Sequence, residues 1–284
     1  MHMKTRVVAD SSCGISIEEA KKIDLEILPL VINFGKESYR DGTEMNNEQF
    51  FKKLETSADF PTTSQPPFEE LVQLCKQAKA NQERLYLLVL SSKISGTYQS
   101  ACLAKEKVGY DEVYIIDSLA TVQVFKILVL ETLKLKDQME PKVLIAHLQS
   151  LRQRTKLIAA VDTLEYLWRG GRVSRSTAFL GGLLNIKPLI KIDEEGNIVA
   201  YAKKHGLNKA LNALVEEFLN DSYDENYPVY FGYCKNDSGC NQLMEKVFEK
   251  CPISRYHKED ISPVIGVHVG TNASIITYVK KEEK

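Results

Sequence analysis

Short runs of β-branched residues alternate with longer amphipathic stretches through the first half of the sequence, and this alternation constrains the fold more than any other feature. The runs predict strands, and the stretches between them carry apolar residues at helical spacing. Leu85–Leu90 is apolar apart from Tyr86, which is typical of a strand covered by helices on both faces. The order predicts βαβ units around a parallel sheet. Predicted strands are Thr5–Ala9, Leu25–Phe34, Leu85–Leu90 and Val113–Asp117, and predicted helices are Asn46–Leu54, Phe68–Ala80 and Thr97–Val108.

The pattern changes after a helical stretch that Pro141 opens and that runs to Arg154. Ile186–Ile192 and Ile198–Lys203 flank a turn-rich link and predict a β-hairpin, and therefore a mixed sheet. We predict an α/β protein of two domains, residues 1–157 and 158–284, with a boundary near 155–160. The other elements predicted downstream are the strands Leu157–Val161 and Val229–Cys234, the helices Leu207–Leu219 and Gly239–Lys250, and closing strands around Pro263–Val269 and Ser274–Val279.

Composition and charge exclude several classes of protein. The 284 residues are 44% apolar and 26% charged, enough for each of two domains to bury a core. The 37 basic and 38 acidic residues leave a formal charge of −1, so general attraction to nucleic acid is not expected. No apolar run is long enough to cross a membrane, and the first residues lack the apolar stretch of a signal peptide. We expect a cytoplasmic protein without membrane insertion.

The six cysteines do not indicate a metal site. They include no CxxC pair, and a loose set of Cys234, Cys240, Cys251 and His257 has spacings that match no zinc knuckle. Disulfides are likewise not expected in a chain without a secretion signal. The sequence therefore predicts no metal and no cofactor.

Three loops that follow or precede predicted strands carry unusual polar residues, and ligands often bind where parallel strands end. Asp10-Ser11-Ser12 comes directly after the first strand, and Asp10 either caps the next segment or takes part in binding. Pro61–Pro67 holds three consecutive hydroxyl residues between prolines that stiffen the backbone. Such hydroxyls are available as hydrogen-bond donors.

The third loop, Ser91–Ser100, leaves an apolar strand and opens a predicted helix. Backbone amides and the positive end of the helix dipole favour an anion there, either a carboxylate or a phosphate. A nucleophilic serine is the competing hypothesis, although GxSxG is absent and no histidine is close in sequence. The phosphate-cradling pattern GxxxxGK[ST] is also absent, so ATP binding is not expected.

Two further segments could carry function. Arg169–Arg175 is predicted to be an exposed basic turn before a helix that Ser174 caps. This turn either presents guanidinium groups to a partner or is simply solvated. His268 lies between β-branched residues, where a structural imidazole is the common outcome, so spacing alone does not select it.

These residues, taken together, resemble the bacterial DegV proteins, which include the fatty-acid-binding subunits of the fatty acid kinase system. The resemblance covers residues 4–282, and the motifs follow the family order. It implies an N-terminal three-layer α/β/α domain with a parallel sheet, a C-terminal two-layer α/β domain with a mixed sheet, and a bound long-chain fatty acid. The motifs are Asp10-Ser11, Thr63-Ser64-Gln65-Pro66, Ser91-Ser92 with Ile94–Ser100, Ile115–Ser118, Gly170–Ser174, Ile186-Lys187-Pro188 and Val264–His268.

By this resemblance, Thr63 and Ser95 hold the carboxylate of a fatty acid such as palmitate or oleate, and His268 is an additional polar neighbour. Arg172 resembles the exposed arginine that docks to the kinase catalytic subunit. The family's arginine after Ile198–Lys203 is replaced here by His205, in the same docking region. The resemblance implies a lipid carrier that presents its ligand to a separate kinase, and not an enzyme.

The chain departs from the family pattern at three places, and two other functions stay open. Ala120–Phe125 is bulkier than the glycine-containing family stretch, and Thr271–Ala273 replaces a Gly-Pro-Gly type turn; the third departure is His205. One alternative is a hydrolase or transferase of a small carboxylate or acyl substrate that uses Ser95. The other is an interaction module with Arg172 on its working surface.

Overall fold

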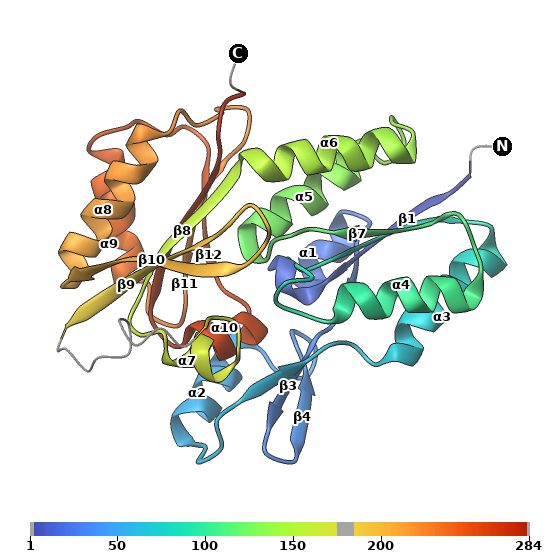
Figure 1. Cartoon of the computed structure of the whole chain (residues 1–284), viewed down its shortest axis with the longest axis horizontal. Helices are drawn as coiled ribbons and strands as arrows, with labels where there is room; N and C mark the ends of the chain where they lie inside the picture. Colours follow the sequence, from blue (N-terminus) through green and yellow to red (C-terminus); the bar gives the residue numbers. More distant parts are fainter. Residues whose placement is uncertain (1–2, 175–184, 283–284) are drawn as a thin grey trace. The chain divides into compact units, whose positions relative to one another are not determined.

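The computed structural model describes residues 3–174 and 185–282, and the chain divides into two compact units (Figure 1). The first unit comprises Met1–Asn46 and Asp59–Arg152, and the second comprises Asn47–Ala58 and Gln153–Lys284. Helix α2 (Asn47–Thr56) therefore belongs to the second unit, although residues of the first unit flank it in sequence.

The first unit contains a four-stranded sheet in the order β2-β1-β6-β7, with all neighbours parallel. This confirms the parallel sheet that the alternating sequence pattern predicts. Helices α3 and α4 pack together on one face, and α5 contacts β1 and the short 3-10 helix η1 (Ser11–Cys13). The elements are β1 (Thr5–Asp10), α1 (Ile17–Lys22), β2 (Glu26–Leu28), α3 (Phe68–Asn81), β6 (Arg84–Val89), α4 (Thr97–Val108), β7 (Val113–Asp117), α5 (Val122–Leu135) and α6 (Pro141–Arg154).

The core beneath α3 and α4 explains why these segments form helices. Leu71, Cys75 and Ala78 recur on one face of α3 and pack with Leu85 and Leu87 of β6. Alternate residues of a strand share a face, so the two leucines point to the same helical layer. Burying a leucine side chain stabilises the fold by about 1.5–3 kcal/mol.

Part of the predicted strand Leu25–Phe34 is wrong. The structure breaks it at Pro29 into β2 and β3 (Val31–Phe34), which belong to different sheets. Proline lacks the amide that a strand ladder requires, so continuous pairing stops there. Strand β3 is the middle strand of a small antiparallel sheet with β4 (Glu37–Arg40) and β5 (Thr62–Ser64).

The second unit contains a six-stranded sheet in the order β10-β9-β8-β13-β11-β12, in which only β11 and β12 are parallel neighbours. The mixed sheet and the β9–β10 hairpin confirm the sequence prediction. The elements are β8 (Thr155–Val161), α7 (Glu165–Arg169), β9 (Ile186–Ile192), β10 (Ile198–His205), α8 (Leu207–Asn220), β11 (Val229–Tyr233), α9 (Ser238–Phe248), β12 (Tyr256–Asp260), α10 (Pro263–Val269) and β13 (Ala273–Val279).

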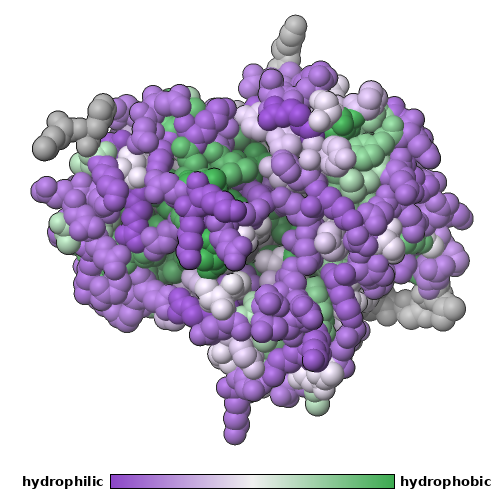
Figure 2. Space-filling model, turned by 180° about the vertical axis from the view of Figure 1, so that it is seen from behind, coloured by the Kyte–Doolittle hydropathy of each residue, from purple (hydrophilic) through white to green (hydrophobic). Residues whose placement is uncertain are grey.

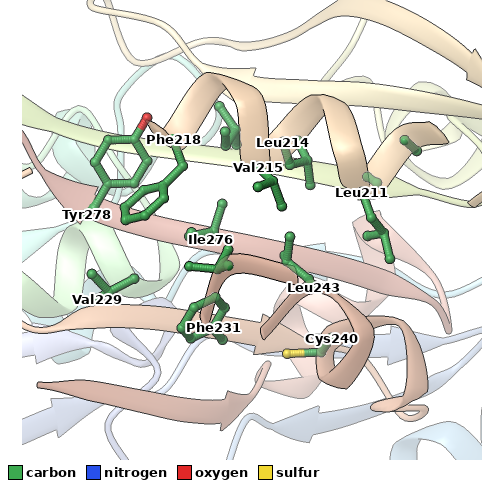
Figure 3. Close-up of a cluster of buried hydrophobic side chains, with 14 of the residues drawn as sticks. Leu211, Leu214, Val215, Phe218, Val229, Phe231, Cys240, Leu243, Ile276 and Tyr278 are labelled. Atoms are coloured by element: carbon green, nitrogen blue, oxygen red, sulfur yellow. The ribbon is translucent and has the colours of Figure 1, made fainter. Parts of the chain in front are cut away.

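Helices α8 and α9 lie side by side and cover the sheet of the second unit with an apolar layer (Figure 3). Leu211, Leu214 and Phe218 line the inner face of α8, at the spacing of a helical stripe. They meet Leu243 from α9 and Ile276 from β13, all of which are inaccessible to solvent or nearly so. Together with the parallel sheet of the first unit, this arrangement confirms the two-domain α/β class.

The strand predicted around Pro263–Val269 is wrong, because this segment is helix α10. Pro263 occupies the first turn, where its fixed φ suits a helix and its missing amide costs nothing. The amides of Ile265 and Gly266 both donate to the Ser262 carbonyl, at 3.0 Å. The segment was predicted as a strand because it is rich in β-branched residues.

The helix α5 was not predicted, because it is apolar on almost every side and lacks a polar stripe.

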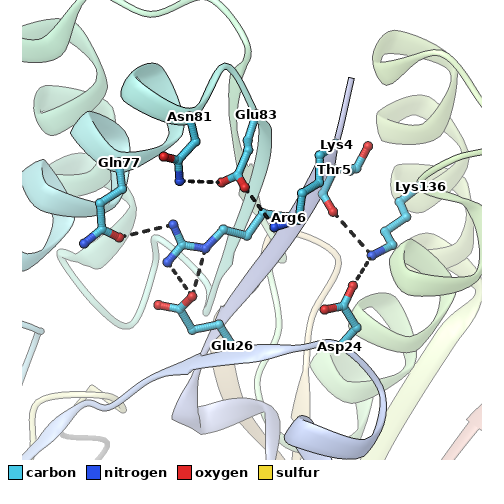
Figure 4. Close-up of polar contacts among 9 residues, drawn as sticks. All are labelled: Lys4, Thr5, Arg6, Asp24, Glu26, Gln77, Asn81, Glu83 and Lys136. Atoms are coloured by element: carbon cyan, nitrogen blue, oxygen red, sulfur yellow. Dashed lines mark hydrogen bonds and ion pairs between the residues drawn. The ribbon is translucent and has the colours of Figure 1, made fainter. Parts of the chain in front are cut away.

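Ion pairs connect residues of neighbouring elements at the edge of the first unit's parallel sheet (Figure 4). Arg6 on β1 binds Glu26 on β2 and donates to the Gln77 side chain at 3.3 Å. Lys136 binds Asp24 at 2.8 Å. Pairs of this kind near the surface contribute about 0–1 kcal/mol each, so they contribute less than the apolar core.

Hydrophilic residues cover most of the face that Figure 2 shows. Large apolar side chains that remain exposed belong to different elements, such as Leu103 on α4, Val143 on α6 and Leu219 on α8. Scattered residues of this kind are normal on a folded protein. Within the described residues, no helix has the length and hydropathy needed to span a membrane.

Candidate functional site

The loop from β6 to α4 is held by its own hydrogen bonds. The Ser91 carbonyl accepts from the amides of Ile94 and Ser95, each at 3.1 Å, and the Ser91 hydroxyl accepts from the Lys93 amide at 3.2 Å. The Ser91 amide donates to the carbonyl of Ala120, at the end of the neighbouring β7 loop. The loop therefore has a defined conformation before any ligand arrives.

Ser95 precedes the first residue of α4 by two positions, and its hydroxyl is oriented by Thr97. The Ser95 Oγ accepts from the Thr97 amide at 3.2 Å and lies 2.9 Å from the Thr97 Oγ1. Thr97 is fully buried, whereas Ser95 is only partly buried. When Thr97 donates to Ser95, the Ser95 O–H is left to donate to a ligand. Thr97 stands within the Ser91–Ser100 segment, but its orienting role was not predicted, although a Ser-x-Thr pattern at a helix start is a known hydroxyl–backbone motif.

Thr63 and Ser95 come from different segments that meet within the first unit. Thr63 is half-buried on β5. Two residues later, the Gln65 Oε1 accepts from the Ser100 hydroxyl of α4 at 3.0 Å, and a methyl group at Gly96 would lie 3.1 Å from the same atom. Gln65 therefore connects the strand that carries Thr63 to the helix start beside Ser95.

Asp10 is a structural cap at the end of β1. Its carboxylate accepts from the Ser12 amide at 3.0 Å and the Ser12 hydroxyl at 2.6 Å, which confirms the capping interpretation. The Leu90 amide at the end of β6 donates to the other carboxylate oxygen at 2.6 Å. Burial raises the pKa of Asp10 to about 6, although all three hydrogen bonds favour the ionised form.

The β7 loop repeats this arrangement. Asp117 accepts from the amides of Ser92 and Leu119, at 3.1 and 3.0 Å. The Ser118 hydroxyl donates to the Ala120 carbonyl at 3.1 Å and accepts from the Ala120 amide at 3.2 Å. Carboxylates at the ends of β1 and β7 thus accept from backbone amides of the loop after β6, and these bonds hold the loop that leads to α4.

His268 lies in the last turn of α10 in the second unit, not in a strand as predicted. A methyl group at Gly170 would overlap with the His268 ring, with 2.8 Å to Cε1, so Gly170 leaves space for the imidazole. Burial, and then the nearby Arg172 charge, lower the pKa of His268 to about 3. The imidazole is therefore neutral at physiological pH and retains one N–H donor.

Arg172 is half-buried, which corrects the expectation of an exposed arginine. Its guanidinium donates to the Gly170 carbonyl, which folds the side chain back onto the turn. Burial lowers the pKa of Arg172. The helix expected after Ser174 lies outside the described residues.

His205 is exposed at the end of β10, opposite Ile186 in the hairpin register. The structure places Arg172 and His268 next to each other, but within the described residues it shows no contact between His205 and either of them. Within the same ranges, no three histidine, cysteine or acidic side chains are arranged to hold a metal ion.

Comparisons with known proteins agree with this architecture. The family model described as "Uncharacterised protein, DegV family" matches residues 4–281. A DegV domain-containing protein of Halalkalibacterium halodurans is 32% identical over 285 residues, which cover 98% of this chain and 99% of that protein.

Two solved structures are also similar to this chain. One is described as fatty acid binding of a DegV family protein from Thermus thermophilus; it has 28% identity and a TM-score of 0.87, and the match covers 98% of this chain and all of that one. The other is DegV, a fatty acid binding protein from Bacillus subtilis, with 28% identity, a TM-score of 0.84, and coverage of 99% and 100%. The family model spans nearly the whole chain, and the similarity extends over nearly the full length of the related protein. This chain therefore belongs to the DegV family.

Proposed function

We propose that the chain binds one long-chain fatty acid, such as palmitate or oleate, whose carboxylate accepts hydrogen bonds from the hydroxyls of Thr63 and Ser95. The observation that carries the proposal is the geometry of Ser95 at the start of α4. Its oxygen accepts from the Thr97 amide, and when the Thr97 hydroxyl also donates to it, the Ser95 proton is left for a ligand. The start of a 12-residue helix adds a positive potential that favours a carboxylate by about 0.3–1 kcal/mol.

The family supports a lipid as the ligand. The solved relatives from Thermus thermophilus and Bacillus subtilis are both described as binding fatty acids, and each is similar over its full length. Each methylene removed from water contributes about 0.8 kcal/mol, so ten would contribute roughly 8 kcal/mol before ordering costs. Tail burial therefore sets the affinity, and the hydroxyls set the orientation of the head group.

We further propose that the protein acts as a carrier, which presents the carboxylate to a separate kinase for acyl-phosphate formation. His268, neutral because burial lowers its pKa to about 3, serves as an additional polar neighbour of the head group without adding a charge. Arg172 and His205 are the proposed docking residues for the kinase. The hydrogen bonds of Ser95 within the described residues go to a hydroxyl residue and not to an imidazole, which favours a donor over a nucleophile.

The test is fatty-acid retention by the double variant Thr63→Ala/Ser95→Ala. Thr62→Ala/Ser92→Ala is the matched control, because Thr62 and Ser92 are exposed neighbours in the same two segments. Mass spectrometry of an organic extract should find about one fatty acid per chain for the control and the unmodified protein, and a clear loss for the test variant. Equal retention by two folded variants would refute the carboxylate assignment.

The same Ser95→Ala protein separates a carrier from an enzyme. A carrier shows no turnover of acyl esters or thioesters with or without Ser95. Turnover by the isolated chain that disappears in Ser95→Ala would replace the carrier proposal with a hydrolase or transferase.

Docking is tested separately with a purified fatty acid kinase catalytic subunit. Arg172→Ala and His205→Ala should lower the rate of acyl-phosphate formation and leave fatty-acid retention unchanged. An unchanged rate in both variants would remove these residues from the docking surface.

A further inference from the structure

A cavity of about 210 Å³ lies within the second unit, beside the end of β8 and the start of β13. The proposed fatty-acid site does not use any of its residues. The polar side chains that line it are Asp162, Lys187, Asn236, Ser238, Asn272 and Ser274.

Two helices begin at the cavity. Leu207, the first residue of α8, and Ser238, the first residue of α9, both line it. In α9 the Ser238 amide donates to the Asn236 side chain at 3.0 Å. The next two amides, of Gly239 and Cys240, have no acceptor within the helix, because the first amides of any helix lack one. The positive end of the 11-residue helix α9 therefore faces this space, and the first residue of α8 lies beside it.

Ser274 provides a second and independent indication of a ligand. It is only 3% exposed and lines the cavity, yet its hydroxyl has no hydrogen-bond partner within residues 3–174 and 185–282. A methyl group at Gly239 would lie 2.6 Å from the Ser274 Oγ, so this hydroxyl faces the first turn of α9. The Ser274 Oγ is not among the buried atoms that lack a partner, so this hydroxyl opens onto the cavity, where a ligand can reach it.

The charged groups hold the cavity lining in place, but they do not set the sign of the electrostatic potential in the cavity. Lys187 forms an ion pair with Asp162, and the Asn272 amide donates to the other Asp162 oxygen at 2.8 Å. The pair is neutral in sum, so the potential in the cavity comes from the start of α9. The serine hydroxyls and the amides of Gly239 and Cys240 are donors, and the Lys187 ammonium and the Asn272 amide are further donors that Asp162 shares. This set suits a ligand made of acceptor oxygens.

We propose that this cavity binds a phosphate group, either as free inorganic phosphate or as the head of a small phosphomonoester. At roughly 30 Å³ per water molecule, its volume equals about seven waters, which is room for a phosphate and a short substituent. Gly239 is required because a side chain there would press on Ser274 and narrow the space between the sheet and α9. The site is independent of fatty-acid binding.

The experiment is isothermal titration of the full chain with inorganic phosphate and, separately, with methyl phosphate, at fixed ionic strength. Saturable binding is expected. Ser274→Ala should weaken it roughly five- to tenfold, as for loss of one hydrogen bond to a charged group, and Lys187→Gln by about tenfold or more. The controls are Thr277→Val and Lys191→Gln, which alter the same two strands outside the cavity lining.

Each result of these titrations either supports or overturns the phosphate site. Absence of saturable binding for both ligands overturns it, and so does binding that the test variants and the controls weaken equally. Tighter binding of methyl phosphate identifies a phosphomonoester as the ligand, and tighter binding of inorganic phosphate identifies the free ion. Gly239→Ala, which keeps every polar group, should also weaken binding; should Ser274→Ala fail to fold, Gly239→Ala and Lys187→Gln carry the test.

Discussion

The strand-end loops of the two units use polar side chains in opposite ways. In the first unit, the loops after β1, β6 and β7 place Asp10, Ser91 and Ser118 in hydrogen bonds with neighbouring backbone. In the second unit, Ser274 is the second residue of β13, and its hydroxyl has no partner within the described residues and lines a cavity. A hydroxyl at the end of a strand is thus structural when neighbouring backbone supplies its partner, and available for a ligand when it does not.

This difference also explains why Ser95 differs from its neighbours in the same loop. Ser91 is buried and bonded within the loop, while Ser95 is partly buried and is oriented by Thr97. The first unit therefore combines a set of hydrogen bonds within its loops with one partly buried hydroxyl that Thr97 orients.

The largest expected effect is loss of stability in Asp10→Ala. The substitution leaves the buried amides of Ser12 and Leu90 without their acceptor, and each orphaned donor costs about 1–3 kcal/mol. We expect urea unfolding to show a loss of about 3 kcal/mol. Ser274→Ala should change stability by less than about 0.5 kcal/mol, since no hydrogen bond is lost. Similar losses in the two variants would show that the paired Asp10 carboxylate and the unpaired Ser274 hydroxyl contribute equally to stability.

Glycine substitutions give a second contrast. Gly170→Ala overlaps with the His268 ring and lies 3.2 Å from the Tyr166 carbonyl, so we expect a loss of about 2 kcal/mol. Gly96→Ala meets only the end of the flexible Gln65 side chain, at 3.1 Å, and should cost less than about 0.5 kcal/mol. Thermal unfolding of both variants measures the difference, and a larger loss in Gly96→Ala would show that the first-unit loop is the tighter one.

The pH dependence of stability should have opposite signs for His268 and Asp10. The pKa of His268 falls from 6.5 to about 3, so below pH 6.5 the unfolded chain binds the extra proton and stability falls as pH falls. The pKa of Asp10 rises from 3.8 to about 6, so between these values the folded chain binds the extra proton and stability falls as pH rises. Each slope is at most about 1.4 kcal/mol per pH unit.

Nuclear magnetic resonance titration measures these pKa values directly, with His268→Gln and Asp10→Asn to assign the signals. A His268 ring that titrates near pH 6.5 would show that the imidazole is solvated, and would remove its role as a neutral neighbour. An Asp10 carboxyl that titrates near pH 4 would show that its hydrogen bonds outweigh its burial.

Ser118→Ala removes one hydroxyl from the β7 loop and should have a smaller effect than Asp10→Ala. The hydroxyl both donates to and accepts from Ala120, so its loss should cost about 1 kcal/mol in urea unfolding. Thr121→Val is the control, because the buried Thr121 hydroxyl has no partner within the described residues. A greater cost for Thr121→Val would contradict the distinction between paired and unpaired hydroxyls.

Local pattern predicted much of the fold. The bounds of α4 and β7 match the prediction residue for residue, because helical spacing and a β-branched run mark them clearly. The strand predicted at Leu25–Phe34 failed at Pro29, and that at Pro263–Val269 failed because a helix start outweighed strand propensity. Of the candidate site, the sequence indicated the hydroxyl residues of two loops but not Thr97 or Gln65, which orient and connect them.

Local sequence pattern accounts for elements such as α4 and β7, since periodicity and turn residues act over a few positions. The pairing of polar groups depends on the tertiary structure, because the partners are distant in the chain: Asp10 bonds Leu90, eighty residues away, and Gln65 bonds Ser100. It also placed α2 in the second unit, where a methyl group at Gly266 would lie 2.8 Å from the Phe50 ring. Local propensity cannot encode such pairings, because they depend on close packing between segments that only the folded chain brings together.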